Sequence, residues 1–324
     1  MRRLYRKFKN RYYTAFLIVR LLVPVFLTVL LLLLLISTGV LTDVVHPTHS
    51  LEVIYPSDYH MYAVDFTWDG AGDDVLQGWY IRGSNQSPLI ILCHGYDTNR
   101  TEVLSLASRL RDYGYNIFVY NLRGHGLSGQ AVSSLGLREV EDLHKAVEKL
   151  VQRPEVDFNR IGIYGSSLGA FVALKASKGN PHMRVLVLDS VYPNIETFIS
   201  MKVEDIVGFR TSLLSFFVRM LYRLYFRAPA DLVSAEITPE DYSGKSILFI
   251  TGKDKASAGL AKETRRLYTN FKCRKEILNL ANSRESLLFG EEKHRYDQFV
   301  LDYFRKELPL IEESVKIDLG NSPR

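Results

Sequence analysis

The chain has 324 residues, enough for one large α/β domain and an appendage, and 47% of them are hydrophobic, as in an ordinary globular protein. Its net charge of +5 comes from residues 1–13, which hold six Lys and Arg and no acidic residue. The rest of the chain has a net charge of about −1. This balance excludes a nucleic-acid binder with a basic folded domain.

A long apolar run follows the basic tail. Leu21–Ser37 carries no charge, and a segment at about 14–40 is long enough to cross a hydrocarbon layer of roughly 30 Å. No Lys or Arg follows the run until Arg82, so the positive-inside rule predicts a single-pass membrane protein with a cytoplasmic tail at 1–13 and an extracytoplasmic domain. The alternative is a cleaved signal peptide. The length of the run and the lack of a small-x-small cleavage site argue against it.

After a linker at 41–60, short apolar segments alternate with amphipathic ones. We expect strands at 61–68, 75–82, 88–93, 116–121, 160–164, 184–189, 246–251 and 274–280, and helices at 102–113, 140–152, 168–177, 261–270 and 296–307. Buried strands that alternate with helices form a mostly parallel sheet covered on both faces. The sequence therefore predicts an α/β domain at 61–312, followed by a C-terminal tail at 313–324.

The interval at 191–245 is too long for a simple connection between a strand and a helix. It is rich in aromatic residues and helix formers, and we interpret it as a helical cap over the edge of the sheet. Within it, Arg219, Arg223 and Arg227 recur every four residues and form one stripe on a helix. The stripe is either a solvated face or a contact with anionic lipid headgroups.

The two cysteines, Cys93 and Cys273, should not form a disulfide. Cys93 ends one predicted strand and Cys273 precedes another, so they lie at opposite ends of a parallel sheet. A disulfide needs a Cα separation of roughly 6 Å.

The predicted nucleophile is Ser167. Residues Gly165–Gly169 match G-x-S-x-G, and the glycine spacing selects Ser167 because Tyr164 occupies the position that a frame on Ser166 would need. A predicted strand runs into this pentapeptide and a predicted helix runs out of it, which is the context of a nucleophile elbow. Glycines on either side of the serine relieve the crowding of such a sharp turn.

A serine hydroxyl needs a base to take its proton, and the base needs a carboxylate to orient it. In this architecture the chain order is serine, acid, histidine. His294, in the predicted loop before the last helix, follows Ser167 at a suitable distance along the chain and is the predicted base. Asp254, just after the strand at 246–251, is the preferred acid, and Asp189 at the end of the preceding strand is the alternative.

The oxyanion of an acyl-transfer reaction needs backbone N–H donors. The N–H of Leu168 follows the nucleophile at the start of a helix, and Tyr96 lies in the His94-Gly95-Tyr96 loop after the strand at 88–93. We predict that these two N–H groups form the oxyanion hole. His94 precedes the nucleophile in the chain, so we expect it, like His125, to be structural.

Five sequence segments together resemble the α/β-hydrolase superfamily, in particular its membrane-anchored branch of bacterial and ABHD-type hydrolases. They are Tyr55–Tyr59, Gly78–Tyr80, His94–Arg100, Arg123–Ser128 and Ile161–Ala170, and the resemblance spans about Val53 to Leu308. It implies hydrolysis of esters, thioesters or amides by a Ser-His-Asp triad without a cofactor. The chain departs from the pattern at Asn121, where the family usually has Asp, at Ala170, where glycine is common, and in a long charged segment at 281–293.

We expect a serine hydrolase that acts on lipid-like acyl esters or thioesters through an acyl-enzyme intermediate, with no metal and no cofactor. Its expected partners are a small-molecule or lipid acyl substrate and the membrane. A serine peptidase or amidase on the same fold is one alternative. The other is a non-catalytic interaction protein, because a fold does not fix a function.

Overall fold

The computed structural model describes residues 2–47, 52–72, 74–128, 132–252, 258–280, 288 and 290–310. The described residues contain one sheet of eight strands, in the spatial order β1-β2-β4-β3-β5-β6-β7-β8. The strands are β1 (Ala63–Asp69), β2 (Val75–Ile81), β3 (Ser87–Cys93), β4 (Asn116–Tyr120), β5 (Val156–Ser166), β6 (Met183–Asp189), β7 (Ser246–Thr251) and β8 (Arg274–Asn279). The pairs β1–β2 and β2–β4 are antiparallel, and all other neighbours are parallel. The predicted α/β class, the mostly parallel sheet and all eight strands are confirmed.

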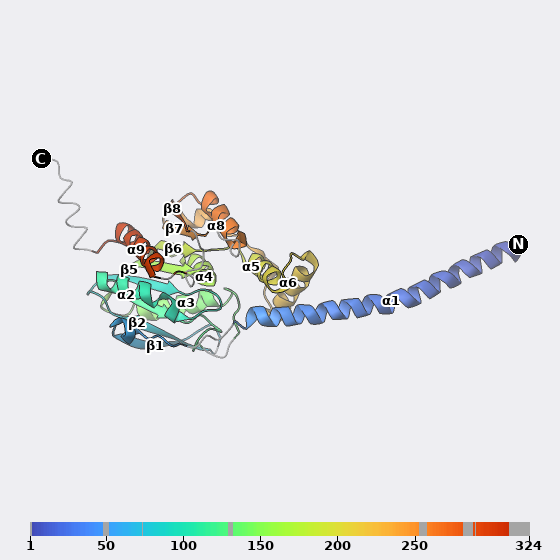
Figure 1. The fold of residues 1–324 in the computed structure, drawn as a ribbon, viewed down its shortest axis with the longest axis horizontal. Helices are drawn as coiled ribbons and strands as arrows, with labels where there is room; N and C mark the ends of the chain where they lie inside the picture. The colour runs from blue at the N-terminus through green and yellow to red at the C-terminus, as the bar shows by residue number, and fades with distance from the viewer. Residues whose placement is uncertain are drawn as a thin grey trace. The chain divides into compact units, whose positions relative to one another are not determined.

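Helices cover both faces of this sheet (Figure 1). They include α2 (Leu104–Tyr113), α3 (Glu139–Leu150), α4 (Leu168–Ser177), α8 (Ala258–Asn270) and α9 (Gly290–Glu307), together with the short 3-10 helices η1 (Pro56–Tyr59), η2 (Arg100–Val103) and η3 (Pro239–Tyr242). Successive strand residues point to opposite faces. Accordingly, Leu248 and Ile250 of β7 join the core beneath α2 and α9, whereas Phe249 contacts two aromatic rings, Tyr268 of α8 and Phe271 just after it.

The last helix packs beside α2 and extends the core of the N-terminal half (Figure 1). Leu110 of α2 and Val300 and Phe304 of α9 are fully buried in one cluster. Tyr115, just after α2, donates a hydrogen bond to the carbonyl oxygen of Leu308 (2.9 Å). Helix α9 begins at Gly290, six residues before the predicted start. His294 therefore lies inside a helix, and our placement of it in a preceding loop is wrong.

The chain divides into two compact units. One contains Met1–Val44 and Ile199–Ala228, and the other contains Val45–Phe198 and Pro229–Arg324. The first unit holds most of α1 (Arg2–Val45), most of α5 (Ile195–Val207) and all of α6 (Ser212–Phe226). Helix α7 (Ala230–Ser234) lies in the second unit. The cap interval is thus helical, as expected.

Helix α1 is longer than the predicted membrane segment. Ala15–Val45 has a mean hydropathy of 2.9 in its most apolar window, which by length and composition is enough to cross a membrane. A membrane anchor and a signal sequence share these properties. The helix continues to Val45, so the first five residues of the predicted linker at 41–60 are helical; residues 48–51 of that linker, like the predicted tail at 313–324, lie outside the described residues.

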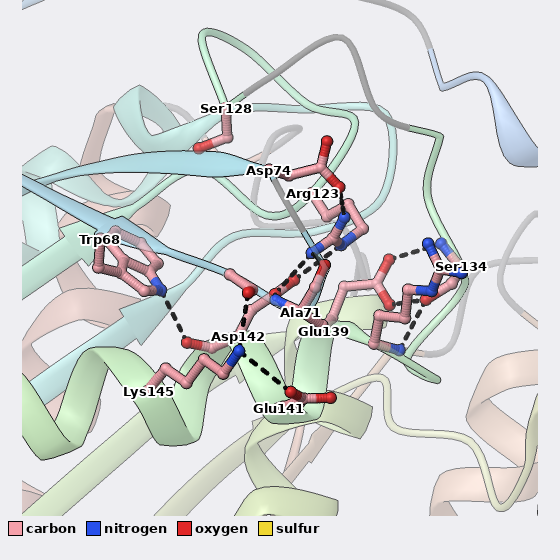
Figure 2. A network of polar contacts seen from close by, with 12 residues as sticks. Trp68, Ala71, Asp74, Arg123, Ser128, Ser134, Glu139, Glu141, Asp142 and Lys145 are labelled. Atoms are coloured by element: carbon pink, nitrogen blue, oxygen red, sulfur yellow. Dashed lines mark hydrogen bonds and ion pairs between the residues drawn. The ribbon is translucent and has the colours of Figure 1, made fainter.

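The arginine of the Arg123–Ser128 segment holds two distant parts of the chain together (Figure 2). Arg123 is fully buried, and its Nε and Nη2 atoms lie 2.9 and 2.7 Å from the two carboxylate oxygens of Asp142 on α3. Its guanidinium also donates to Asp74 and to the carbonyl oxygen of Ala71 (2.7 Å). Asp142 in turn accepts from the backbone N–H of Ala71 (2.6 Å). This part of the family resemblance is therefore structural.

Both cysteines are buried, and neither forms a disulfide in this structure. Burial raises the pKa of the Cys93 thiol to about 12. It also raises the pKa of Cys273.

Candidate active site

Ser167 occupies a strained turn between β5 and α4. Its backbone angles are φ 48° and ψ −110°, in a region that non-glycine residues rarely adopt. The glycines on either side have no room for a side chain. A Cβ on Gly165 would lie 2.4 Å from the carbonyl group of Gly169. The predicted elbow geometry is therefore present, and the Ser167 side chain is half-buried at its tip.

The loop after β3 lies directly against this elbow. A Cβ on Gly169 would come within 2.4 Å of the carbonyl oxygens of Cys93 and His94, and one on Gly95 would come within 3.4 Å of Ser166 Oγ. The two segments that carry Tyr96 and Leu168, the predicted oxyanion donors, are thus in contact. Leu168 is the first residue of α4, where backbone N–H groups lack partners within the helix.

His94 holds the loop in place. Its Nε2 accepts a hydrogen bond from the N–H of Leu122 (3.0 Å), which leaves the proton on Nδ1 for the carbonyl oxygen of Gly95 (2.7 Å). Burial, and then the neighbouring His125, hold the pKa of His94 well below its usual range. A neutral ring with both nitrogen atoms engaged fits the structural role expected for it.

A buried stack of aromatic rings begins on α4, the helix that follows the elbow. The ring of Phe171, one turn after Ser167, stacks on Tyr192 (4.7 Å between centroids), and Tyr192 stacks on Phe198 (4.7 Å). Phe198 contacts the ring of Tyr96 (5.2 Å). Because Phe171, Tyr192 and Phe198 are fully buried, this stack belongs to the protein core.

His294 contacts α2 in this structure. Its side chain is exposed on α9, and its Nδ1 lies against the guanidinium of Arg109. Arg109 also pairs with the buried carboxylate of Asp297 (3.8 Å), which accepts from Ser105 and Lys293 (both 2.5 Å). Among the described residues, Ser167 Oγ has no hydrogen-bond partner. The structure thus brings His294 to Arg109 and not to Ser167.

Of the two candidate acids, Asp254 lies outside the described residues. Asp189 is fully buried beside the elbow, and its carbonyl oxygen accepts from the N–H of Ser167 (2.8 Å). Its carboxylate accepts from the hydroxyls of Ser190 and Tyr296, each at 2.8 Å. The Tyr296 hydroxyl also lies 2.8 Å from that of Tyr164 on β5. Sequence analysis missed these buried hydrogen bonds, because Tyr296 falls on the apolar face of α9 and cannot be told from an ordinary core residue there.

Comparisons with known proteins agree with this fold. Residues 84–243 match the family model described as serine aminopeptidase, S33. The chain is 23% identical to the uncharacterized protein YqkD of Bacillus subtilis over 255 residues, covering 77% of this chain and 82% of that protein. Its fold is similar to the Pyrococcus furiosus esterase Pf2001, with a TM-score of 0.63, 19% identity, and coverage of 82% of this chain and 98% of the esterase. It is also similar to a Pyrococcus horikoshii acylaminoacyl peptidase (TM-score 0.58, 16% identity, 77% of this chain and 42% of the peptidase).

The chain has the α/β-hydrolase fold. Within the described residues of this hydrolase-fold protein, no three His, Cys, Asp or Glu side chains cluster in a way that would hold a metal ion.

The chain departs from the α/β-hydrolase sequence pattern at Asn121, and the structure shows what this asparagine does. The Asn121 side-chain amide donates to Glu52 Oε1 (2.6 Å), while its carbonyl oxygen accepts from the N–H of Arg100 (2.9 Å). The Arg100 guanidinium pairs with Glu52 Oε2 (2.9 Å) and lies 3.4 Å above the ring of Trp79. An aspartate at 121 would face the buried Glu52 carboxylate. The amide at position 121 is therefore matched to a glutamate in the segment that follows α1.

Proposed function

We propose that this protein is a serine hydrolase that cleaves acyl esters, with Ser167 as its nucleophile. The observation that carries the proposal is the strained conformation of Ser167, held between two glycines whose Cβ positions the backbone fills. Such strain costs of order 1–3 kcal/mol and persists where the surrounding structure enforces it, as at active sites. A turn without a chemical role has no need of it.

In the proposed reaction, Ser167 Oγ attacks the ester carbonyl carbon while a histidine takes its proton. The N–H groups of Leu168 and Tyr96 stabilise the oxyanion. The alcohol leaves with the proton, and water then attacks the acyl-enzyme to release the acid and restore the serine. We assign the base to His294 and the orienting acid to Asp254. This assignment requires the His294 ring to exchange its contact with Arg109 for one with Ser167.

The proposed substrate class rests on a membrane location and on the named activities of similar proteins. We propose that α1 anchors the protein in a membrane, with the N-terminus in the cytoplasm and the hydrolase domain outside. A membrane location brings the domain close to lipid-like esters. The similarity to a protein named esterase favours esters, and the similarity to an acylaminoacyl peptidase makes amides the alternative substrates.

The experiment is labelling of the full-length protein with a fluorophosphonate, which reacts with activated serines. Ser166→Ala is a matched control, because Ser166 is the half-buried neighbour in the wrong frame of the motif. Wild type and Ser166→Ala should label, and Ser167→Ala should not. Ester turnover should fall by about 10⁴-fold or more in Ser167→Ala. Labelling that persists in Ser167→Ala would refute the assignment.

The contact between His294 and Arg109 favours a second candidate, a non-catalytic binding protein on the same fold. Two variants separate the candidates. If His294 is the base, His294→Ala abolishes labelling and Arg109→Ala, which releases the ring, preserves or increases it. Folded wild-type protein that neither labels nor hydrolyses a panel of esters graded by acyl length, nor peptide amides, would establish the binding protein.

A further inference from the structure

Helix α6 of the cap is apolar on two opposite faces. Leu214, Val218, Tyr222 and Phe226 recur every four residues and are buried. A second set, at the spacing i, i+3, i+4, i+7 and i+11, lies on the other side: Leu213, Phe216, Phe217, Met220 and Leu224. Of these, Leu213, Phe216 and Leu224 are 62, 54 and 68% exposed. A helix that is apolar all round belongs in a protein core or in contact with a membrane.

Other large apolar side chains just before α6 are exposed too. They are Phe209, in the turn before α6, and Ile206, at the end of α5. Large exposed apolar side chains gathered within one short stretch of a folded protein favour an interaction site. We call the exposed side chains of Ile206, Phe209, Leu213, Phe216 and Leu224 the outer cap face.

Most charges around this face are positive, although Glu204 and Asp205 precede Ile206 and Asp231 follows Ala230. From Ile206 to Ala230 the chain contains Arg210, Arg219, Arg223 and Arg227 and no Asp or Glu. Arg219, Arg223 and Arg227 form the stripe predicted from the sequence, which runs along one edge of the outer cap face. An apolar face bordered by arginines is the pattern of a helix that lies in the interface of a phospholipid bilayer, with guanidinium groups at the phosphates.

A candidate membrane span belongs to the same compact unit as this face. Unit one joins residues 1–44 with 199–228. Along α1, side chains from Ala15 to Ile36 are exposed or half-buried, whereas Ser37, Val40, Leu41 and Val44 are buried. Twenty-two helical residues span about 33 Å, close to the thickness of the hydrocarbon layer. The change at Ser37 therefore marks the point where α1 leaves the bilayer and enters the protein.

We infer that the outer cap face is a membrane-binding surface, inserted into the same bilayer that α1 crosses, with the arginine stripe at the headgroups. The inference rests on the proposed membrane anchoring of α1 and is independent of hydrolysis. It gives the cap a second contact with the membrane besides the anchor.

The test uses the full-length protein in phosphatidylcholine nanodiscs. Leu213, Phe216 and Leu224 are replaced one at a time by cysteine and labelled with an environment-sensitive fluorophore. Wild type is the labelling blank, because both native cysteines are buried. Leu31→Cys, in the exposed part of α1, is the positive control. Ser212→Cys is the matched control, because it is exposed on the same helix but rotated about 100° from Leu213.

We expect lipids with a shallow spin label to quench the three probes several-fold more strongly than the probe at 212, and iodide in the water to quench them less. Equal quenching at all four α6 positions would overturn the inference. Protection from iodide without quenching by the lipid would also overturn it, since another protein or a second copy would then cover the face. Both readouts are fluorescence signals, so an inactive hydrolase would not affect them.

Discussion

The side-chain amide of Asn121 donates a hydrogen bond of 2.6 Å to the carboxylate of Glu52, a residue 69 positions earlier in the chain. This contact fastens the segment that follows α1 to the loop that ends in Arg100. It exists only because position 121 carries an amide where the superfamily pattern has a carboxylate.

Asn121→Asp should therefore destabilise the protein. Two buried carboxylates would replace a hydrogen bond, at a cost of about 2 kcal/mol. One of the two would have a raised pKa in the folded state, so it would bind a proton more readily there than in the unfolded chain. The loss should shrink as the pH falls toward about 4. Thermal unfolding across this pH range measures it, and Glu52→Gln in the same chain should restore stability if the pairing is responsible.

Removing Arg123 and removing the charge of Asp142 should reduce the free energy of unfolding by different amounts. Arg123→Met leaves the buried Asp142 carboxylate without its cation and should cost about 3–5 kcal/mol. Asp142→Asn should cost less, because the arginine keeps Asp74 and burial already raises the pKa of Asp142. Urea unfolding of both variants in detergent gives the comparison. Equal losses would mean that the ion pair is not what holds Arg123 in place.

The contact between the elbow and the loop after β3 is tested at Gly169. Gly169→Ala places a methyl group 2.4 Å from two carbonyl oxygens, so the backbone must move, at a cost of about 1–3 kcal/mol. We expect lower stability and loss of fluorophosphonate labelling. Gly244→Ala is the control, since a Cβ there has no neighbour within 4 Å. Should Gly169→Ala label like wild type, the proximity of loop and elbow would not matter for the serine.

The buried side chain of Lys245 should make the free energy of unfolding rise as the pH becomes alkaline. Its Nζ is buried against the carbonyl oxygens of Asn180 and Met183, and burial lowers its pKa to about 8 from 10.5. Between these values the unfolded chain binds more protons than the folded one, so stability rises with pH, by up to about 1 kcal/mol per pH unit. Lys245→Met should remove this contribution, and Lys149→Met, at an exposed position, should not. Denaturation profiles from pH 7 to 10 compare them.

The sequence was sufficient to locate all eight strands, because short runs such as Ile247–Ile250 are apolar on both faces of a covered sheet. It also located the elbow, because the glycines at 165 and 169 are a steric requirement of the turn. These features are local, and each is encoded in the residues that form it.

The features that sequence analysis missed depend on distant residues. The start of α9 lies at Gly290, a glycine with positive φ in a charged segment where hydrophobic periodicity says little. The contact of His294 with Arg109 joins residues 185 positions apart, and the pairing of Glu52 with Asn121 joins a linker to a loop. No spacing rule relates such partners, since the folded sheet alone brings them together.

The position of α9 has a consequence for biogenesis. Part of the core shared by α2 and the sheet stays uncovered until α9 packs against it, and the hydroxyl that reaches Asp189 belongs to Tyr296 of α9. A nascent chain that stops short of α9 would leave these apolar side chains exposed although the eight described strands are already made. The domain therefore completes its core only after α9 has been synthesised, and chains truncated before α9 should be recognised by chaperones or proteases.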